Sequence, residues 1–182
     1  MKNALILHGT NGYPEENWYT WLKCKLIKEG WNVWLPQLPM SEKPNIQRYN
    51  RFLLSKNDWS FNSKTIIIGH SSGAVAALGL LQALPKDIIV DRCFLIGSFK
   101  DDLGWEELQD FFSIPLDYKK IKGKAKQFLF IHSDDDPYCP LDHTEFLSRK
   151  IGGTLVIKEG EKHFSISTGG KKYSKFPFLF NL

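Results

Sequence analysis

Cysteine is scarce in this sequence, and the few cysteines are far apart. Cys24, Cys93 and Cys139 are the only three in the 182-residue chain. An odd number of thiols at wide spacing argues against a disulfide framework and against a metal site, because both need cysteines in matched sets. Free thiols are typical of a reducing compartment, so the sequence predicts a cytoplasmic protein that holds no metal ion.

Long apolar runs and strong charge of one sign are also missing. No window approaches the roughly 18 apolar residues of a membrane-spanning helix. The apolar stretch at residues 4–7 ends at His8, too short for the core of a signal peptide. The net charge is only +4, and its basic excess is spread out apart from residues 119–126 and 171–172. We interpret the lysine-rich segment at 119–126 as a solvated loop and strand entrance, and expect neither nucleic acid nor membrane as a partner.

Length and composition fit one domain. The chain is 42% apolar and 24% charged, close to the averages of globular proteins, and it is long enough for one core over residues 1–182. Short apolar segments alternate with helical patterns. Strands are expected at residues 3–7, 31–35, 65–68, 91–97, 126–132 and 154–157, and helices at about 14–29, 46–54, 74–84 and 141–150. This alternation predicts an α/β fold, a mostly parallel sheet of about five to six strands with helices on both faces.

One segment is less regular than the rest. Residues 98–124 contain apolar positions that suggest a short amphipathic helix and a loop. At under 30 residues, we interpret the segment as a capping helix over one sheet edge in preference to a partial lid.

A serine occupies a tight turn between a predicted strand and a predicted helix. Residues 69–73 read Gly-His-Ser-Ser-Gly, follow the apolar run at 65–68 and precede an alanine-rich stretch. In such a Gly-x-Ser-x-Gly turn the glycines let strand and helix approach, and the strained central residue projects its hydroxyl above the sheet. The N-terminus of the next helix favours negative charge nearby, as an oxyanion requires. The pattern predicts a nucleophile elbow with Ser71 as the nucleophile.

A serine nucleophile needs a neutral imidazole and an acid that orients it. In enzymes built on this turn, the acid and the base follow the serine in chain order, at the carboxyl ends of later strands. Among five histidines this order removes His8 and disfavours His70, whereas His163 follows the last predicted strand and a turn. We assign the base to His163. Three consecutive aspartates at residues 134–136 are the candidate acids, and their spacing lacks the pattern of a calcium loop.

Two backbone N–H groups should hold the oxyanion. One belongs to Ser72, directly after the nucleophile, and the other to the loop after the first strand, where residues 9–12 read Gly-Thr-Asn-Gly. Thr10 is the first choice for this donor and Asn11 the next. Because the loop lacks a Gly-x-Gly-x-x-Gly pattern, a nucleotide cofactor has weak support, and no cofactor is expected.

Aromatic residues offer a binding surface for substrate. Trp18, Trp21 and Trp105 are candidate walls of an apolar acyl site, with core packing favoured for at least two of the three. We select Trp18, together with Asn11, as the substrate-binding prediction.

The motifs taken together resemble a known family. They are His-Gly-Thr at 8–10 with Trp-x-x-Trp-Leu at 18–22, the turn at 69–73, Asp-Asp-Asp-Pro-Tyr-Cys-Pro at 134–140, and His-Phe at 163–164. This set is similar to the small α/β-hydrolases of the retinoblastoma-binding protein 9 type, called YdeN-like in bacteria. The resemblance runs over nearly the whole chain and implies a serine hydrolase of minimal α/β-hydrolase fold with little or no lid.

The resemblance also selects one acid. In this family the acid begins an Asp-x-x-apolar-Pro pattern, which falls on Asp136 here, with Cys139 in the apolar position. One departure is Lys162, because similar sequences usually carry glycine directly before the base. This difference concerns the local turn and not the three catalytic residues.

The expected function is hydrolysis of small carboxylic esters by a carboxylesterase-like enzyme. Ser71 would attack, His163 would move the proton, and Asp136 would orient His163. The same three residues also suit an amidase, a peptidase or an acyltransferase, because an acyl-enzyme accepts several nucleophiles. A protein-binding homologue without activity is the alternative from another class. The expected partner is a small ester or amide, and a protein partner stays open.

Overall fold

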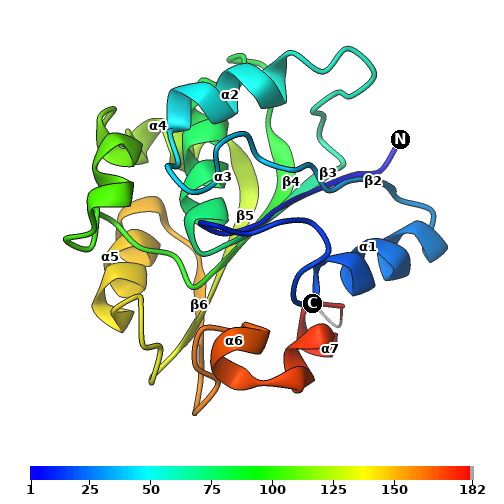
Figure 1. Ribbon diagram of the computed structural model, residues 1–182. Coiled ribbons are helices and arrows are strands. Elements are labelled where there is room, and N and C mark those ends of the chain that lie inside the picture. The colour runs from blue at the N-terminus through cyan, green and yellow to red at the C-terminus, as the bar shows by residue number, and fades with distance from the viewer. Residues whose placement is uncertain (181–182) are drawn as a thin grey trace.

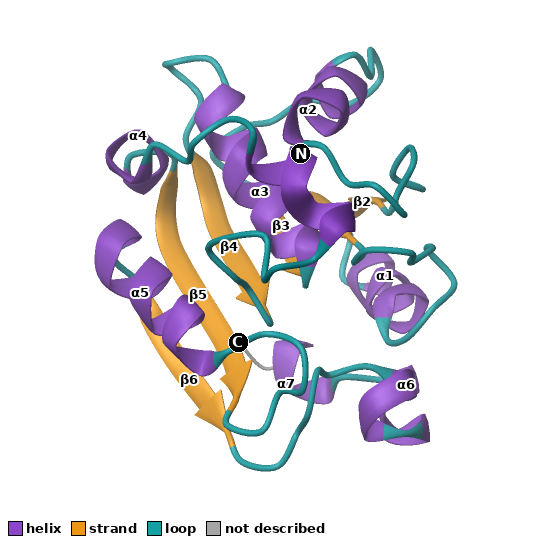
Figure 2. Cartoon of the chain, turned by 60° about the vertical axis from the view of Figure 1, so that its left-hand side comes forward, coloured by secondary structure: helices purple, strands orange, loops and turns teal. Residues whose placement is uncertain are grey.

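A computed structural model of the chain describes residues 1–180. Its centre is a parallel sheet in the order β2-β1-β3-β4-β5-β6. The strands are β1 (Asn3–Leu7), β2 (Asn32–Trp34), β3 (Thr65–His70), β4 (Val90–Ile96), β5 (Ala125–Ser133) and β6 (Thr154–Lys158). Figure 2 shows β4, β5 and β6 pointing to the same end of the molecule. The predicted α/β fold class is confirmed, and the loops that follow these strands meet at one edge.

Helices cover both faces of the sheet (Figure 1). On one face lie α2 (Ile46–Leu54), α3 (Ser72–Ala83), α4 (Tyr118–Lys122) and α5 (Leu141–Ile151), and on the other α1 (Tyr19–Lys28) and α7 (Pro177–Phe180). The short α6 (Ile166–Gly169) and two 3-10 helices, Glu106–Phe112 and Lys171–Ser174, complete the secondary structure of the described residues. Within residues 1–180, no helix combines the length and the apolar character needed to cross a membrane.

Each face of the sheet has its own apolar core. In β1, Leu5 and Leu7 pack with residues of α2, α3 and α5, whereas Ala4 and Ile6 pack with residues of α1. Successive side chains of a strand point to opposite faces, so a strand buried on both sides must be apolar throughout. This explains why the predicted strands are continuous apolar runs.

The structure differs from the predicted elements in three main places. The lysine-rich segment expected to be a solvated loop contains the helix α4 at Tyr118–Lys122, in which Ile121 is buried, and Lys124 after it is only 5% exposed. The first helix begins at Tyr19 and not near residue 14, because Asn17 has a φ of +50° and interrupts the turns before it. After β6, no sequence pattern predicts α6, the second 3-10 helix or α7. Each of these is only four residues long, too short to show helical periodicity, and the segment is held by Tyr173, Phe176 and Leu179 in the core beside α1.

Candidate active site

Ser71 lies between β3 and α3, as the motif predicts for its strand, turn and helix. Its backbone has φ +58° and ψ −127°, a region that a non-glycine residue rarely adopts. The Ser71 N–H donates to the Ile96 carbonyl at 2.8 Å. A Cβ at Gly69 would lie 2.3 Å from the Gly73 oxygen, and a Cβ at Gly73 would lie 2.3 Å from the Leu7 oxygen. Both flanking glycines are therefore required for this close packing.

The serine opens into a cleft of about 320 Å³ that gathers residues from distant parts of the chain. Five segments contribute: the loop after β1, the turn at Ser71, the irregular segment after β4, the loop after β5 and the loop after β6. The lining residues that matter below are Thr10, Asn11, Ser71, Trp105, Tyr138 and His163. Ser71 and His163, more than ninety residues apart in sequence, thus share one cavity.

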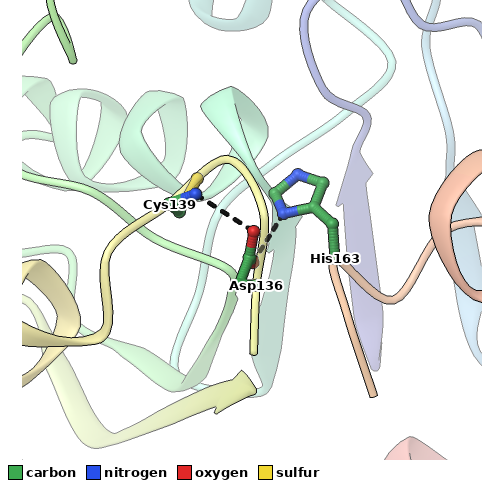
Figure 3. Close-up of side chains that lie close together, drawn as sticks. All are labelled: Asp136, Cys139 and His163. Carbon is green, nitrogen blue, oxygen red and sulfur yellow. Dashed lines mark hydrogen bonds and ion pairs between the residues drawn. The ribbon is translucent and has the colours of Figure 1, made fainter. Parts of the chain in front are cut away.

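Asp136 and His163 form a buried pair. The Asp136 Oδ2 lies 2.7 Å from the His163 Nδ1, and the two side chains are 1% and 7% exposed. The other carboxylate oxygen accepts the N–H groups of Tyr138 at 2.9 Å and Cys139 at 3.0 Å. Burial by itself would raise the pKa of Asp136, but the hydrogen bond and charge of His163, with these N–H groups, hold that pKa below its usual value. Figure 3 shows the second ring nitrogen of His163 turned away from Asp136.

The three aspartates have separate partners in the loop that carries His163. We call this contact the acid–base junction, formed by residues 133–136 and 160–163. Its hydrogen bonds join Gly160 N–H to Asp134 at 2.9 Å, Glu161 N–H to the Ser133 hydroxyl at 2.9 Å, Lys162 N–H to Asp135 at 2.8 Å, and His163 to Asp136. Of the three aspartates, Asp136 is the one bonded to the imidazole, and the neighbouring side chains hold the backbone beside it.

Lys162 occupies a position where the backbone favours glycine. Its φ is +54°, in the left-handed region. Asp135 holds it there, because one carboxylate oxygen accepts the Lys162 N–H at 2.8 Å and the other lies 2.6 Å from the Lys162 ammonium. The hydrogen bond from this side chain is the largest reason why the pKa of Asp135 falls to about 2. The departure from glycine is therefore matched by a local partner.

The loop after β1 contains two candidate oxyanion donors, the backbone N–H groups of Thr10 and Asn11. The Asn11 N–H donates to the Ser41 carbonyl at 3.0 Å and is already used. Thr10, which also lines the cleft, is the remaining choice of the two. Ser72 is the first residue of α3, so its N–H has no partner within the helix. The geometry is compatible with Thr10 and Ser72 as a pair of oxyanion donors.

Buried histidines position the loops of the site. His70 Nε2 donates to the His163 carbonyl at 2.7 Å, and His70 Nδ1 accepts the Tyr19 hydroxyl at 2.6 Å. Burial is the main reason why the pKa of His70 falls to about 3, so this ring is neutral. His8 and His132 play similar parts: His8 Nδ1 lies 2.9 Å from the Gly9 carbonyl, and His132 Nε2 lies 2.9 Å from the Cys139 carbonyl.

Sequence reasoning did not find these supporting residues. His70 occupies a variable position of the turn motif, and its partner Tyr19 is 51 residues away. Nothing local in the sequence links either residue to the His163 backbone. The only sequence signal is that a polar residue stands at the end of an otherwise apolar strand.

The substrate-binding prediction for Trp18 is corrected by the structure. Trp18 is fully buried and does not line the cleft, and its indole N–H donates to the Phe164 carbonyl at 3.0 Å. It therefore supports the loop of His163 from behind. Trp21 packs against the same core as Trp18, whereas Trp105 lines the cleft. Two of the three tryptophans are thus core residues, as favoured above, but the one in the cleft is Trp105. Asn11 does line it.

Asp136, Cys139 and His163 also have the chemistry of a metal-ligand set. One ligand atom from each lies within 4.8 Å of the others. Both oxygens of Asp136 already accept hydrogen bonds, however, and burial raises the pKa of the Cys139 thiol well above its usual value, which disfavours a thiolate ligand. These bonds suit an oriented acid and base better than a metal centre.

The parallel sheet, its two helical layers and the serine turn at the carboxyl end of β3 define an α/β-hydrolase fold. The chain belongs to the serine hydrolase family, whose sequence model matches residues 4–181. The resemblance drawn from the motifs is thereby confirmed.

Individual relatives agree with this family. The chain is 24% identical to YdeN of Bacillus subtilis (strain 168) over 182 residues, covering 100% of this chain and 94% of that protein. The crystal structure of the B. subtilis ydeN product superposes with a TM-score of 0.90 at 23% identity, covering 100% of this chain and 96% of that one. Serine hydrolase RBBP9 of Rattus norvegicus is 27% identical over 167 residues, covering 88% and 86%.

A structure from work on carboxylesterases of Nitrososphaera gargenis superposes with a TM-score of 0.70 at 14% identity, covering 89% of this chain and 83% of that one. At this identity the likeness concerns the fold alone.

Proposed function

We propose that this chain hydrolyses small carboxylic esters through an acyl-enzyme formed on Ser71. The observation that carries the proposal is the buried Asp136–His163 pair, joined at 2.7 Å, in the cleft that also contains Ser71. A hydroxyl is a weak nucleophile until a base removes its proton, and a carboxylate on Nδ1 fixes the imidazole in the tautomer that can do so.

Each group has a defined role in the proposed reaction. His163 Nε2 takes the Ser71 proton as Oγ attacks the ester carbonyl carbon, and the N–H groups of Thr10 and Ser72 stabilise the oxyanion. His163 then gives that proton to the departing alkoxide, which leaves as the alcohol. A water molecule, activated by the same imidazole, releases the acid and restores Ser71. The strained turn acts as the nucleophile elbow in this scheme.

Small esters are the proposed substrates because the cleft is small. Its volume of about 320 Å³ lies at the lower end of the range for small-molecule sites. Amides, peptides and acyl transfer use the same intermediate, so product analysis with added alcohols or amines separates these reactions from hydrolysis.

A covalent probe tests the proposal directly. The wild type and Ser71→Ala are incubated with a fluorophosphonate probe, and both are assayed with short p-nitrophenyl esters. Heat-denatured wild type is the control for non-specific labelling, and circular dichroism checks that the variant is folded. We expect labelling and turnover in the wild type only. A folded wild type without labelling would favour the binding-protein alternative.

A further inference from the structure

Two exposed aromatic residues contact each other in the cleft. Trp105 is 40% exposed and Tyr138 is 42% exposed, and their ring centroids lie 5.9 Å apart at an interplanar angle of 79°. Large apolar side chains that cluster on the surface, and not in the core, commonly mark a binding surface for a ligand. We call this pair the aromatic shelf.

The aromatic shelf begins directly beside the base. The Tyr138 and His163 ring centroids are 5.1 Å apart at 82°, so the three rings follow one another edge to face. All three line the cavity that contains Ser71. The shelf is thus continuous with the reacting groups.

Both members of the shelf are held in place by backbone contacts. The Tyr138 N–H donates to Asp136 at 2.9 Å, so the carboxylate that orients His163 also fixes Tyr138. The Trp105 N–H donates to the Asp102 carbonyl at 2.9 Å, and three residues further on Leu108 is buried in the core. The backbone of both residues is therefore fixed, and the rings restrain each other by contact, which lowers the entropic cost of binding.

The position of the aromatic shelf beside His163 indicates which part of the substrate the shelf would contact. In the proposed reaction His163 delivers its proton to the departing oxygen, so the alcohol portion must lie next to the imidazole. The oxyanion donors, Thr10 and Ser72, belong to other segments, the loop after β1 and the start of α3. The surface that adjoins His163 therefore contacts the leaving group more directly than it contacts the acyl oxygen.

We propose that the aromatic shelf of Trp105 and Tyr138 binds the leaving group, and that the preferred substrates are esters of alcohols carrying an aromatic ring. This inference rests on the proposed ester hydrolysis. Edge-to-face and offset contacts with a substrate ring would add to the apolar area that it buries. A merely protective role, in which the two rings cover His163, would affect all esters alike.

Matched acetate esters test this inference. Benzyl acetate and ethyl acetate share an acyl group and have alcohols of similar acidity, so their chemistry is comparable. We expect the wild type to prefer benzyl acetate by about tenfold in kcat/KM, through KM. Trp105→Ala should remove most of this preference by lowering kcat/KM several-fold more for benzyl acetate than for ethyl acetate, and Trp105→Phe should retain much of it. Phe52→Ala, at an exposed aromatic on α2 outside the cleft, is the control and should change neither ester.

A second pair of esters separates the two sides of the scissile bond. Methyl phenylacetate carries its ring on the acyl side, and methyl acetate is its reference. We expect Trp105→Ala to leave the ratio for this pair unchanged. Tyr138→Leu, which keeps the backbone N–H bonded to Asp136, should weaken the benzyl preference in the same way as Trp105→Ala.

The outcomes distinguish failure of the shelf from failure of ester hydrolysis. If Trp105→Ala lowers benzyl and ethyl acetate equally, or if the loss follows the acyl ring, the leaving-group assignment is wrong while ester hydrolysis stands. If the wild type hydrolyses none of the four esters, the proposed function and the inference that rests on it are both overturned.

Discussion

The acid–base junction and the aromatic shelf both adjoin the His163 imidazole but are built in opposite ways. In the junction, four consecutive residues from 133 to 136 each accept a hydrogen bond from residues 160–163, and the Asp136–His163 pair is buried. The shelf exposes two aromatic rings, which contact each other and are carried on hydrogen-bonded backbone. The junction is suited to fixing the orientation of the imidazole, whereas the exposed rings of the shelf are suited to binding a ligand. Substitutions in the first should therefore change kcat, and those in the second KM.

The largest effect is expected where both regions converge, at the nucleophile. Ser71→Ala removes the oxygen that we propose attacks the substrate and should lower kcat on the order of a millionfold, as expected for a Ser-His-Asp enzyme. Steady-state kinetics with a short p-nitrophenyl ester measure this loss. Near-wild-type turnover in a folded Ser71→Ala protein would show that the cleft uses another group.

The next largest effect is expected inside the junction. Asp136→Asn keeps the shape of the side chain but can present an amide donor to His163 Nδ1, which selects the wrong tautomer. We expect kcat to fall about ten thousandfold.

Asp134→Asn is the matched control for Asp136→Asn, because the Asp134 side chain accepts a hydrogen bond from the Gly160 backbone and is not the carboxylate bonded to the imidazole. It should stay within about fivefold of wild type in kcat. If both variants lost activity equally, the whole loop and not the Asp136–His163 pair would determine the rate.

Because His70 is buried, we expect the protein to become less stable toward unfolding at acidic pH. The pKa of His70 is lowered to about 3, whereas an unfolded histidine titrates near pH 6.5. Between these values the unfolded chain binds a proton that the folded chain does not, so the free energy of unfolding falls as the pH falls. This single group should cost about 2 kcal/mol between pH 7 and pH 5.

Urea unfolding at pH 7 and pH 5 measures this dependence. His70→Gln retains polar groups but cannot take up the proton, so the difference between the two pH values should shrink by about that amount. The comparison is made within each protein, which separates the pH effect from any loss of stability common to both conditions. An unchanged pH dependence in His70→Gln would contradict a neutral, buried His70.

The sequence predicted the parts of the site that depend on local pattern. The apolar strands, the turn around Ser71 and the order of the later loops are all visible within short windows. From residue reasoning alone the acid stayed open among three aspartates, because their partners lie 26 or 27 residues away and only the fold assigns each aspartate to its own partner.

Whether a tryptophan lies in the core or in the cleft was harder to predict from sequence than the roles of the polar residues. Trp18 and Trp105 have the same side chain, yet one is fully buried and the other is 40% exposed. Local sequence does not fix this difference, because it depends on which elements pack around each residue. Trp18 is covered by residues that follow β6, a segment in which no sequence pattern predicts a helix.

The smallest effect is expected at Lys162, inside the acid–base junction. Asp135→Asn removes the charge that holds Lys162 in its left-handed conformation, and kcat should fall by about two- to fivefold, in line with an exposed ion pair. Lys162→Gly in that background should restore most of the loss, because glycine adopts a positive φ without a partner. In the wild-type background Lys162→Gly should change little, so the double-mutant cycle isolates the coupling between the two residues.

Acid should weaken this contact only at low pH. The pKa of Asp135 is lowered to about 2, so its contribution is complete above about pH 4 and is lost as the pH falls toward 2. The effect of Asp135→Asn on kcat should therefore be constant between pH 5 and pH 8. If it instead varied over that range, or if Lys162→Gly failed to compensate, the Asp135 carboxylate would hold the His163 loop through a contact other than Lys162.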